Sequence, residues 1–250
     1  MKLTSFILFC IVNTIAGETE EIDEISSRIV GGKNATSDQA PCQCSVQRYS
    51  QHTCGCAIIS ENWILTAAHC VGGSTSNIEI LVGTNDLQSG GTRFTPERFI
   101  IHESYDRPRR MQNDIALIKM AKMQFNSNVK PIKYSTNFVK DGAQLQATGW
   151  GRLSANGNIP RFLQVVNLKA ISNQRCRRFY RNTVFDGILC TYTKVGEGVC
   201  NGDSGGPIVM GDELVGLTSF AVLCAKGYPD GFTRISHYFN WIQINIEKAT

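Results

Sequence analysis

The sequence predicts an all-β protein, and three observations carry this prediction. Charged residues make up 18% of the 250 positions, below the roughly 25% of an average soluble domain, and 23 glycines favour a loop-rich chain. Short apolar runs bounded by turn residues recur along the chain. A helical spacing of apolar residues is found only at the C-terminus. Many short strands in one chain of this length imply packed β-sandwiches or barrels.

The predicted strands are short apolar or alternating runs. They cover 78–82, 99–101, 115–118, 145–147, 166–170 and 208–210. Gly211 and Asp212, after the last of these, have the chemistry of a tight hairpin turn. The C-terminal segment has apolar residues at spacings of three and four, which indicates an amphipathic helix with a stripe of Ile235, Phe239, Ile242 and Ile246.

The first 28 residues have the layout of a secretory leader and a propeptide. Lys2 precedes an apolar run over 6–12, and small residues follow as far as Gly17, so we expect a signal peptide over residues 1–16. Residues 17–28 are acidic with little to bury, which is typical of an exposed activation propeptide. A buried N-terminal strand or a membrane anchor are the alternatives, but no apolar run reaches the ~18 residues of a membrane-spanning helix.

Removal of this leader would leave a basic domain, residues 29–250, with 23 basic and 16 acidic side chains and a net charge of +7. Such a charge attracts nucleic acids, anionic surfaces and acidic peptides alike. No zinc-finger, basic-zipper or RNA-binding signature supports a nucleic-acid partner. We therefore expect a secreted, extracellular protein with neither a nucleic-acid nor a membrane partner.

Three segments contain residue types with reactive roles. One has His69 beside a cysteine, one has Asp114 at the start of an apolar strand, and one has Ser204 flanked by glycines. A hydroxyl is a poor nucleophile at neutral pH, so it needs a base to take its proton and a third group to hold that base. If the chain curls so that the N–H groups of Gly202 and Ser204 point at one oxygen, they form an oxyanion hole, and a side chain at position 202 would hinder that curl.

Each signal also has an ordinary explanation by itself: a packed or surface histidine, a turn or cap aspartate, and a flexible glycine turn. In this order, and with Ile-Val-Gly-Gly at 29–32, they indicate one site. The chain resembles the trypsin- and chymotrypsin-like serine endopeptidases over essentially all of residues 29–250. The resemblance includes Trp-Ile-Leu at 63–65, Thr-Gly-Trp-Gly at 148–151 and Trp-Ile at 241–242.

This resemblance implies two packed six-stranded antiparallel β-barrels with a C-terminal helix, the barrels covering about 29–132 and 133–250 with the active site between them. It also implies acyl transfer, in which Ser204 attacks the scissile carbonyl, His69 accepts and returns the proton, and Asp114 orients the imidazole. Neither a metal nor a cofactor is expected. The expected partners are protein or peptide substrates and protein protease inhibitors, and the enzyme is expected to be a monomer.

The resemblance further implies latency. Cleavage after Arg28 by an activating protease would free the α-amino group of Ile29, and this ammonium would bury against Asp203. Because a buried carboxylate without a partner is costly, the new charge can shift a loop equilibrium. The chain as written is then a zymogen. The alternative is that Arg28 is merely an exposed basic residue.

A specificity pocket can be mapped in the same way. Family members that cut after Lys or Arg carry an aspartate six residues before the nucleophile, where this chain has Gly198 followed by the apolar Val199. The opposite wall is expected at Ser219, Phe220 and Ala221, whose backbone would pair with substrate as an added strand.

Asp230 aligns with a second position at the base of that pocket. With Gly198 it resembles the pockets of arthropod chymotrypsins and crustacean collagenolytic serine proteases. A carboxylate at the pocket base could bind a basic side chain of the substrate. It could instead be hydrogen-bonded to backbone or water, which would leave the pocket effectively apolar. The third interpretation is that Asp230 is a turn residue after Pro229. We expect cleavage after Phe, Tyr or Leu. The methyl group of Ala221 is expected to narrow the pocket entrance and disfavour Trp. Elastase-like or collagenolytic activity is the alternative, and only the resemblance suggests a digestive role.

Ten cysteines in a chain that enters the secretory route indicate disulfides. The resemblance supports three pairs, and the first, worth about 3 kcal/mol in the chain-entropy model, would help to hold His69. They are Cys54–Cys70, Cys176–Cys190 and Cys200–Cys224. A cross-strand bridge from Cys42 or Cys44 to Cys56 and a zinc site are both open for the remaining cysteines. With Cys10 in the leader, one thiol has no assigned partner.

Some residues lie outside these assignments. Two arginine clusters are hypothesised to favour acidic residues upstream of the cut, with a solvated face as the alternative: Arg107, Arg109 and Arg110, and Arg175, Arg177, Arg178 and Arg181. Asn34 begins a glycosylation sequon. Family members that bind calcium have a carboxylate at the position of Thr84, so we do not expect this chain to bind calcium there. His52, His102 and His237 stand in no motif and are interpreted as structural or surface residues.

Two functions of other classes remain as alternatives. A non-catalytic binding homologue would keep the fold and lose a triad residue, whereas this chain has all three. A basic adhesion or toxin-like module would use the arginine clusters and need no catalysis.

Overall fold

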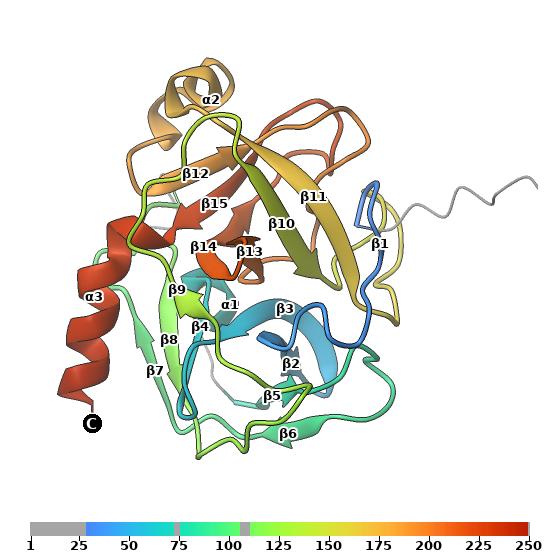
Figure 1. Ribbon diagram of the computed structural model, residues 1–250, viewed down its shortest axis with the longest axis vertical. Helices are drawn as coiled ribbons and strands as arrows, with labels where there is room; N and C mark the ends of the chain where they lie inside the picture. The colour runs from blue at the N-terminus through green and yellow to red at the C-terminus, as the bar shows by residue number, and fades with distance from the viewer. Residues whose placement is uncertain (1–28, 73–75, 106–110, 250) are drawn as a thin grey trace, which may run out of the picture.

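The computed structural model describes residues 29–72, 76–105 and 111–249, which form two curled, mainly antiparallel sheets packed against each other (Figure 1). The expected signal peptide, the propeptide with Arg28, and the first arginine cluster lie outside the described residues. Within the described ranges no helix is long and apolar enough to cross a membrane.

The first sheet has the strand order β6-β5-β2-β3-β4-β8-β7. Its inward side chains, such as Val46, Ile58, Ile80 and Ile118, form the core of the first barrel. The strands are β2 Gln43–Arg48, β3 Gln51–Ile58, β4 Trp63–Thr66, β5 Ile78–Val82, β6 Thr92–Phe94, β7 Arg98–Ile101 and β8 Ala116–Lys119. Between β4 and β5 lies a single turn of helix, α1 Ala68–Val71.

In the second sheet, six strands close into a ring, because they follow the order β11-β10-β13-β14-β15-β12 and β12 pairs back onto β11. They are β10 Gln144–Gly149, β11 Gln164–Ile171, β12 Ile188–Thr191, β13 Pro207–Met210, β14 Glu213–Phe220 and β15 Asp230–Arg234. Two short strands, β1 Lys33–Asn34 and β9 Lys133–Tyr134, add to β11 and β14 respectively.

The two ends of the chain tie the barrels together. The N-terminal segment lies on the second sheet, where Ile29 joins the core and β1 pairs with β11. The C-terminal helix α3 Ile235–Lys248 packs on a core shared by both sheets, with Trp63 from the first and Leu217 from the second. Both chain ends therefore help to join the two sheets.

The structure confirms the predicted fold class, the strands and the turn at Gly211. The C-terminal helix is present, but Tyr238 rather than Phe239 belongs to its buried stripe of Ile235, Tyr238 and Ile242. The helix α2 Asn173–Tyr180, followed by the 3₁₀ turn η1 Arg181–Thr183, was not predicted. The sequence of α2 has no apolar stripe that would indicate a helix, and in the structure Cys176 is its only buried residue.

Candidate active site

His69 and Asp114 meet across the first barrel. His69 lies on α1 with 14% of its side chain exposed, and its Nδ1 is 2.8 Å from Oδ2 of Asp114. The backbone N–H of His69 also donates to Oδ1 of Asp114 (3.0 Å). An ionised carboxylate only accepts, so Nδ1 carries the proton and Nε2 is left as the basic nitrogen.

Asp114 is held from the second barrel as well. Ser219 Oγ, on β14, donates to Oδ2 of Asp114 (2.6 Å), and Thr233 Oγ1, on β15, donates to its backbone carbonyl (2.7 Å). The Asp114 side chain is fully buried. Its two oxygens therefore have three donors and little freedom to rotate. From the sequence, Ser219 is expected only in the pocket wall, and no motif points to Thr233.

Ser204 lies on the loop before β13. Its backbone contacts strand β3 and the helix α1, which carries His69. Its carbonyl oxygen accepts from the N–H of Gly55 on β3 (2.8 Å) and is 3.5 Å from Sγ of Cys70, the residue after His69. Gly205 needs a positive φ of 76° here, and a Cβ on it would overlap Thr66. Among the described residues, Ser204 Oγ has no hydrogen bond, so the hydroxyl is free to turn towards a base.

The N–H groups of Gly202 and Ser204 also have no hydrogen-bond acceptor within the described part of the chain. The curl that frees them depends on Gly202, whose φ is 101° and whose Cβ would lie 2.8 Å from the Ile159 side chain. Two free backbone donors beside a serine are what a developing oxyanion requires.

His52, interpreted from the sequence as a structural or surface residue, contacts the loop that carries Gly202. Its Nε2 lies 2.9 Å from the carbonyl oxygen of Gly202, and its Nδ1 lies 2.8 Å from Ser45 Oγ. Burial lowers the pKa of His52 to about 4, so the ring is neutral and has one N–H. Since a carbonyl only accepts, Nε2 donates to Gly202 and the Ser45 hydroxyl donates to Nδ1. These two hydrogen bonds hold the peptide group that joins Gly202 to Asp203, which lies between the two free N–H donors.

Asp203, the residue before Ser204, is fully buried. Its Oδ1 accepts from Gly151 N (2.7 Å) and its Oδ2 from Cys200 N (2.8 Å). Burial raises its pKa to about 7, against the lowering effect of those two N–H donors. A Cβ on Gly149 or Gly151 would overlap the carboxylate, so both glycines make room for it. No side-chain cation pairs with Asp203 in the described ranges.

The segment that starts at Ile29 is docked on the same region. Ile29 is fully buried in the second-barrel core that also contains Val199. The carbonyl of Val30 accepts from Gly198 N (3.1 Å), and a Cβ on Gly31 would overlap the carbonyl of Gly196. These contacts join the expected activation segment to the expected pocket wall.

Gly198 and Asp230 face each other at the expected pocket base. A Cβ at position 198 would lie 2.5 Å from Asp230 Oδ2, so the carboxyl occupies space that a side chain would need. Oδ2 accepts from Val199 N (3.0 Å), while Oδ1 is buried and has no hydrogen-bond partner among the residues that the structure describes. Burial, with a smaller contribution from the charge of Asp203, raises the pKa of Asp230 to about 8.

The opposite wall follows the end of β14. Ser219 is buried and turned to Asp114, while Phe220 packs edge-on against Tyr180 at 5.2 Å and its ring lies where a Cβ on Gly231 would be. Ala221 is partly buried beside them. Tyr180, on α2, donates its hydroxyl to the carbonyl of Pro229, which precedes Asp230. The unpredicted helix α2 thus supports the pocket from behind.

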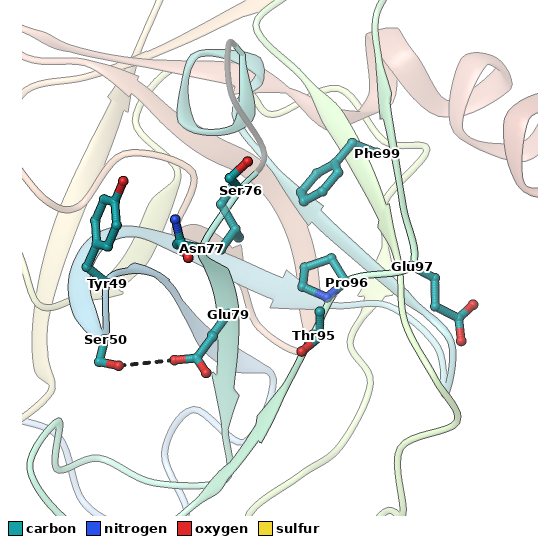
Figure 2. Close-up of a pocket in the computed structure, with 10 residues that line it drawn as sticks. Tyr49, Ser50, Ser76, Asn77, Glu79, Thr95, Pro96, Glu97 and Phe99 are labelled. Atoms are coloured by element: carbon teal, nitrogen blue, oxygen red, sulfur yellow. Dashed lines mark hydrogen bonds between the residues drawn. The ribbon is translucent and has the colours of Figure 1, made fainter.

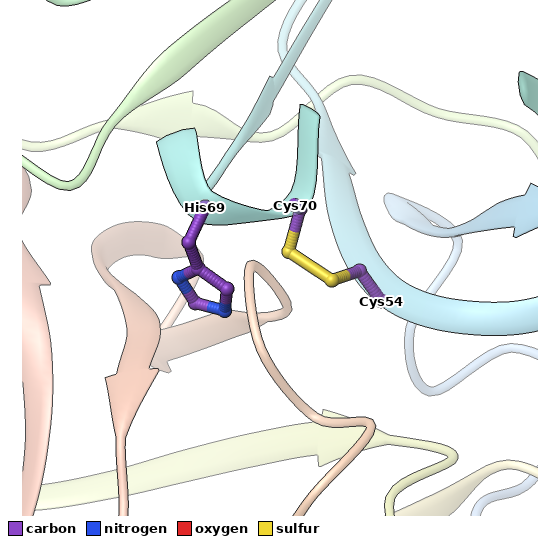
Figure 3. A group of neighbouring side chains, drawn as sticks. All are labelled: Cys54, His69 and Cys70. Atoms are coloured by element: carbon purple, nitrogen blue, oxygen red, sulfur yellow. A yellow bond between two sulfur atoms is a disulfide. The ribbon is translucent and has the colours of Figure 1, made fainter. Parts of the chain in front are cut away.

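The structure has the three disulfides implied by the resemblance, together with Cys44–Cys56 between β2 and β3. Cys42 is the free cysteine of the described chain, and it is buried. Figure 3 shows His69 beside the Cys54–Cys70 disulfide. These three residues are close enough to suggest a metal site, but sulfurs joined to each other offer no thiolate ligands.

Other surface features lie apart from these residues. A cavity of about 590 Å³ opens at the β2–β3 hairpin and shares no residue with the expected pocket. Figure 2 shows Glu79 turned towards Ser50 on its wall, with their oxygens 3.3 Å apart. The second arginine cluster lies on α2 and η1, where Arg177 donates to the carbonyl of Val184 (3.0 Å).

Two curled sheets that bring a histidine–aspartate pair to a glycine-flanked serine define the class of trypsin-like serine peptidases. The Trypsin family profile matches residues 29–242, so the chain belongs to the trypsin family of serine proteases. The alternative of a non-catalytic binding homologue therefore concerns activity and not fold.

Relatives within the family carry both trypsin and chymotrypsin names. Chymotrypsin-2 of Vespa crabro is 39% identical over 220 residues, which cover 87% of this chain and 99% of that protein. Trypsin epsilon of Drosophila erecta is 34% identical over 229 residues, covering 89% of each. Among solved structures, mouse neuropsin, described as a serine protease of the limbic system, superimposes with a TM-score of 0.82 at 29% identity, covering 86% of this chain and 98% of its own.

Proposed function

We propose that this chain is the precursor of a secreted serine endopeptidase, with Ser204 as nucleophile, His69 as general base and acid, and Asp114 as the residue that orients it. The 2.8 Å contact between His69 Nδ1 and Asp114 Oδ2 carries the proposal, because it leaves Nε2 as the proton acceptor. Nε2 takes the Ser204 proton as Oγ attacks the carbonyl carbon, and later delivers it to the leaving amine.

The N–H groups of Gly202 and Ser204 are proposed to stabilise the oxyanion of the tetrahedral intermediate. Their lack of acceptors supports this role. A single donor of this kind is worth about 10²–10³ in kcat in a related mechanism. In the processed enzyme these donors would need little reorganisation at the moment of reaction, because the positive φ of Gly202 and the contact with His52 support the loop.

Cleavage after Arg28 is proposed to activate the enzyme. The buried Ile29 and the buried Asp203, whose two N–H partners carry no formal charge, support an ion pair between the freed α-ammonium and this carboxylate. Burial raises the pKa of Asp203 to about 7, and no side-chain cation among the described residues offsets this effect. The ammonium would remove that cost and favour the active loop.

The proposed preference is for Phe, Tyr or Leu before the cut. Asp230 supports it, because a buried carboxyl with a pKa of about 8 is mostly neutral at pH 7 and does not act as a fixed anion for Lys or Arg. Elastase-like or collagenolytic selectivity is the second candidate. Ala221 supports it, because its methyl group narrows the pocket entrance for large side chains. Profiling a peptide library and scoring the residue before each cut separates these specificities.

The decisive experiment for activity is covalent labelling of the processed protein by a serine-directed organophosphate. We expect one label per molecule, on Ser204, and none on the Ser204→Ala variant. The Arg28→Gln chain, which is not cleaved there, should label poorly. A folded, processed protein that takes up no label would favour the non-catalytic binding homologue instead.

A further inference from the structure

Asn34 starts the sequence Asn34-Ala35-Thr36, which is the only Asn-X-Ser/Thr tripeptide in the 250 residues. It lies on β1, at the outer edge of β11, and both residues of β1 are exposed (Figure 1). An Asn of this pattern on an exposed edge, in a chain with a predicted secretory leader, meets the requirements for an N-linked glycan.

The hydrogen bonds of Asn34 leave the modifiable atom free. Gln164 Nε2 donates to Asn34 Oδ1 (2.9 Å), whereas Asn34 Nδ2 has no acceptor among the described residues. N-linked sugars attach to Nδ2, and the carbonyl oxygen of the amide stays available as an acceptor. The bond from Gln164 can therefore remain after modification and would hold the first sugar in one orientation.

The backbone of an exposed phenylalanine, Phe162, is bonded to the same side chain as Asn34. The same Gln164 Nε2 also donates to the carbonyl of Phe162, which brings the backbone of Phe162 close to the Asn34 side chain. The Phe162 ring is 47% exposed, and the guanidinium of Arg161 lies 5.1 Å from its centroid. That guanidinium is fixed by two bonds to Asp86, at 2.8 and 2.7 Å. Phe162 thus offers a partly exposed ring, in contact with a fixed guanidinium, on a residue whose backbone is close to the Asn34 side chain.

We propose that Asn34 carries an N-linked glycan whose innermost sugar packs on Phe162. The donor is a lipid-diphosphate-linked oligosaccharide of the secretory pathway. The bond from sugar C1 to the diphosphate oxygen breaks, a bond from C1 to Nδ2 forms, Nδ2 loses one proton, and the lipid diphosphate leaves. Transfer takes place on the unfolded chain, so the folded state only has to accommodate the sugar, as the exposure of Asn34 allows. Sugar C–H faces against the ring would then cover apolar surface.

The first test is the occupancy of Asn34. The full-length chain is secreted from insect cells and treated with peptide N-glycosidase in ¹⁸O water, and the peptide with residue 34 is weighed. We expect an ¹⁸O-labelled aspartate at position 34 and a lower mass for the treated protein. Asn34→Gln and Thr36→Ala should remove both signals, while Thr36→Ser should keep them. Wild-type chain without sugar at Asn34 overturns the proposal.

The second test concerns the platform. Thermal unfolding of the uncleaved chain is compared with and without the glycan for wild type, Phe162→Ala and Phe162→Leu, the last of which keeps apolar volume without the ring. We expect removal of the glycan to lower the Tm of wild type by about 2 °C or more, and to change that of both variants much less. Equal effects of glycan removal in all three proteins would overturn the contact with Phe162.

Phe138 offers a matched control. It is 64% exposed and lies 4.1 Å from the guanidinium of Arg234, so it has the same kind of cation–ring contact. Arg234 is bonded to the carbonyl of Ile188 on β12, and β12 pairs with the end of β11 opposite to Asn34. Phe138→Ala should therefore leave the effect of the glycan unchanged, and a loss equal to that of Phe162→Ala would contradict the assignment.

Discussion

His52 Nε2 donates to the carbonyl oxygen of Gly202 at 2.9 Å, so a histidine of the first barrel holds the loop that carries the expected oxyanion donors. We expect His52→Phe to lower kcat about tenfold with little change in KM. The loss should be smaller than the 10²–10³ for removal of a donor, because the N–H groups remain and only their positioning is relaxed. Steady-state kinetics of the processed enzyme measure it.

Two further variants test this assignment. Ser45→Ala removes the hydroxyl that fixes the tautomer of His52, and a smaller fall in kcat is expected. Gln51→Ala, at an exposed neighbouring position on β3, should behave as wild type. A rise in KM at constant kcat for His52→Phe would mean that the residue shapes substrate binding instead.

Replacement of Ser204 by alanine should lower turnover by about three or more decades while the Tm stays within a few degrees of wild type. The hydroxyl has no hydrogen bond in the described structure and the side chain is only partly buried, so its removal costs little stability. Peptide hydrolysis and thermal unfolding of the same preparations check both parts. Retention of more than a tenth of the activity would exclude Ser204 as nucleophile.

Specificity should change with pH through Asp230. Burial raises the pKa of this carboxyl to about 8, so it is mostly neutral below that pH and mostly ionised above it. The ratio of kcat/KM for matched Arg and Phe substrates should therefore rise as the pH increases from 7 to 9. Taking the ratio cancels effects that act on both substrates, such as deprotonation of the Ile29 α-amino group.

Asp230→Asn serves as the control for this prediction, because it has nearly the same shape and does not ionise. Its Arg-to-Phe ratio should stay low and independent of pH. An Arg-to-Phe ratio of kcat/KM that does not change with pH in the wild type would show that the charge of Asp230 does not affect substrate binding or turnover.

Cys42 should be unreactive in the folded protein. It is 7% exposed, and burial raises the pKa of its thiol to about 12, so almost no thiolate is present at pH 8. A disulfide-exchange reagent at pH 8 should detect no thiol in native processed protein and one per molecule after unfolding without reductant. Three thiols after unfolding would contradict the Cys44–Cys56 bond.

Much of the fold could be predicted from local sequence, because short apolar runs and turn residues mark strands directly. The helix α2 could not, since its sequence, with three arginines and the single buried residue Cys176, gives no apolar stripe. The helix is held by the Cys176–Cys190 disulfide and by the N-cap from Ser172. The choice of Tyr238 for the buried face of α3 likewise depends on a distant partner, the side chain of Asn113 (3.0 Å).

The candidate site divides in the same way. His69, Asp114 and Ser204 were selected by residue type and motif, and the structure adds Ser219 and Thr233 as donors to Asp114. His52 was interpreted as a structural or surface residue, because a histidine without a motif has no local signal of its role. Its partners, Ser45 and Gly202, lie 7 and 150 positions away.

By itself, the sequence determined which reactive groups this protein has, the family they belong to and the order in which strands follow one another. Those properties depend on residue type and spacing along the chain. Only the tertiary structure decided the protonation of His52 and Asp230, the isolation of Cys42 and the exposure of Asn34 beside Phe162. Charge state and access depend on burial and on hydrogen-bond partners, and folding brings these together from positions far apart in the chain.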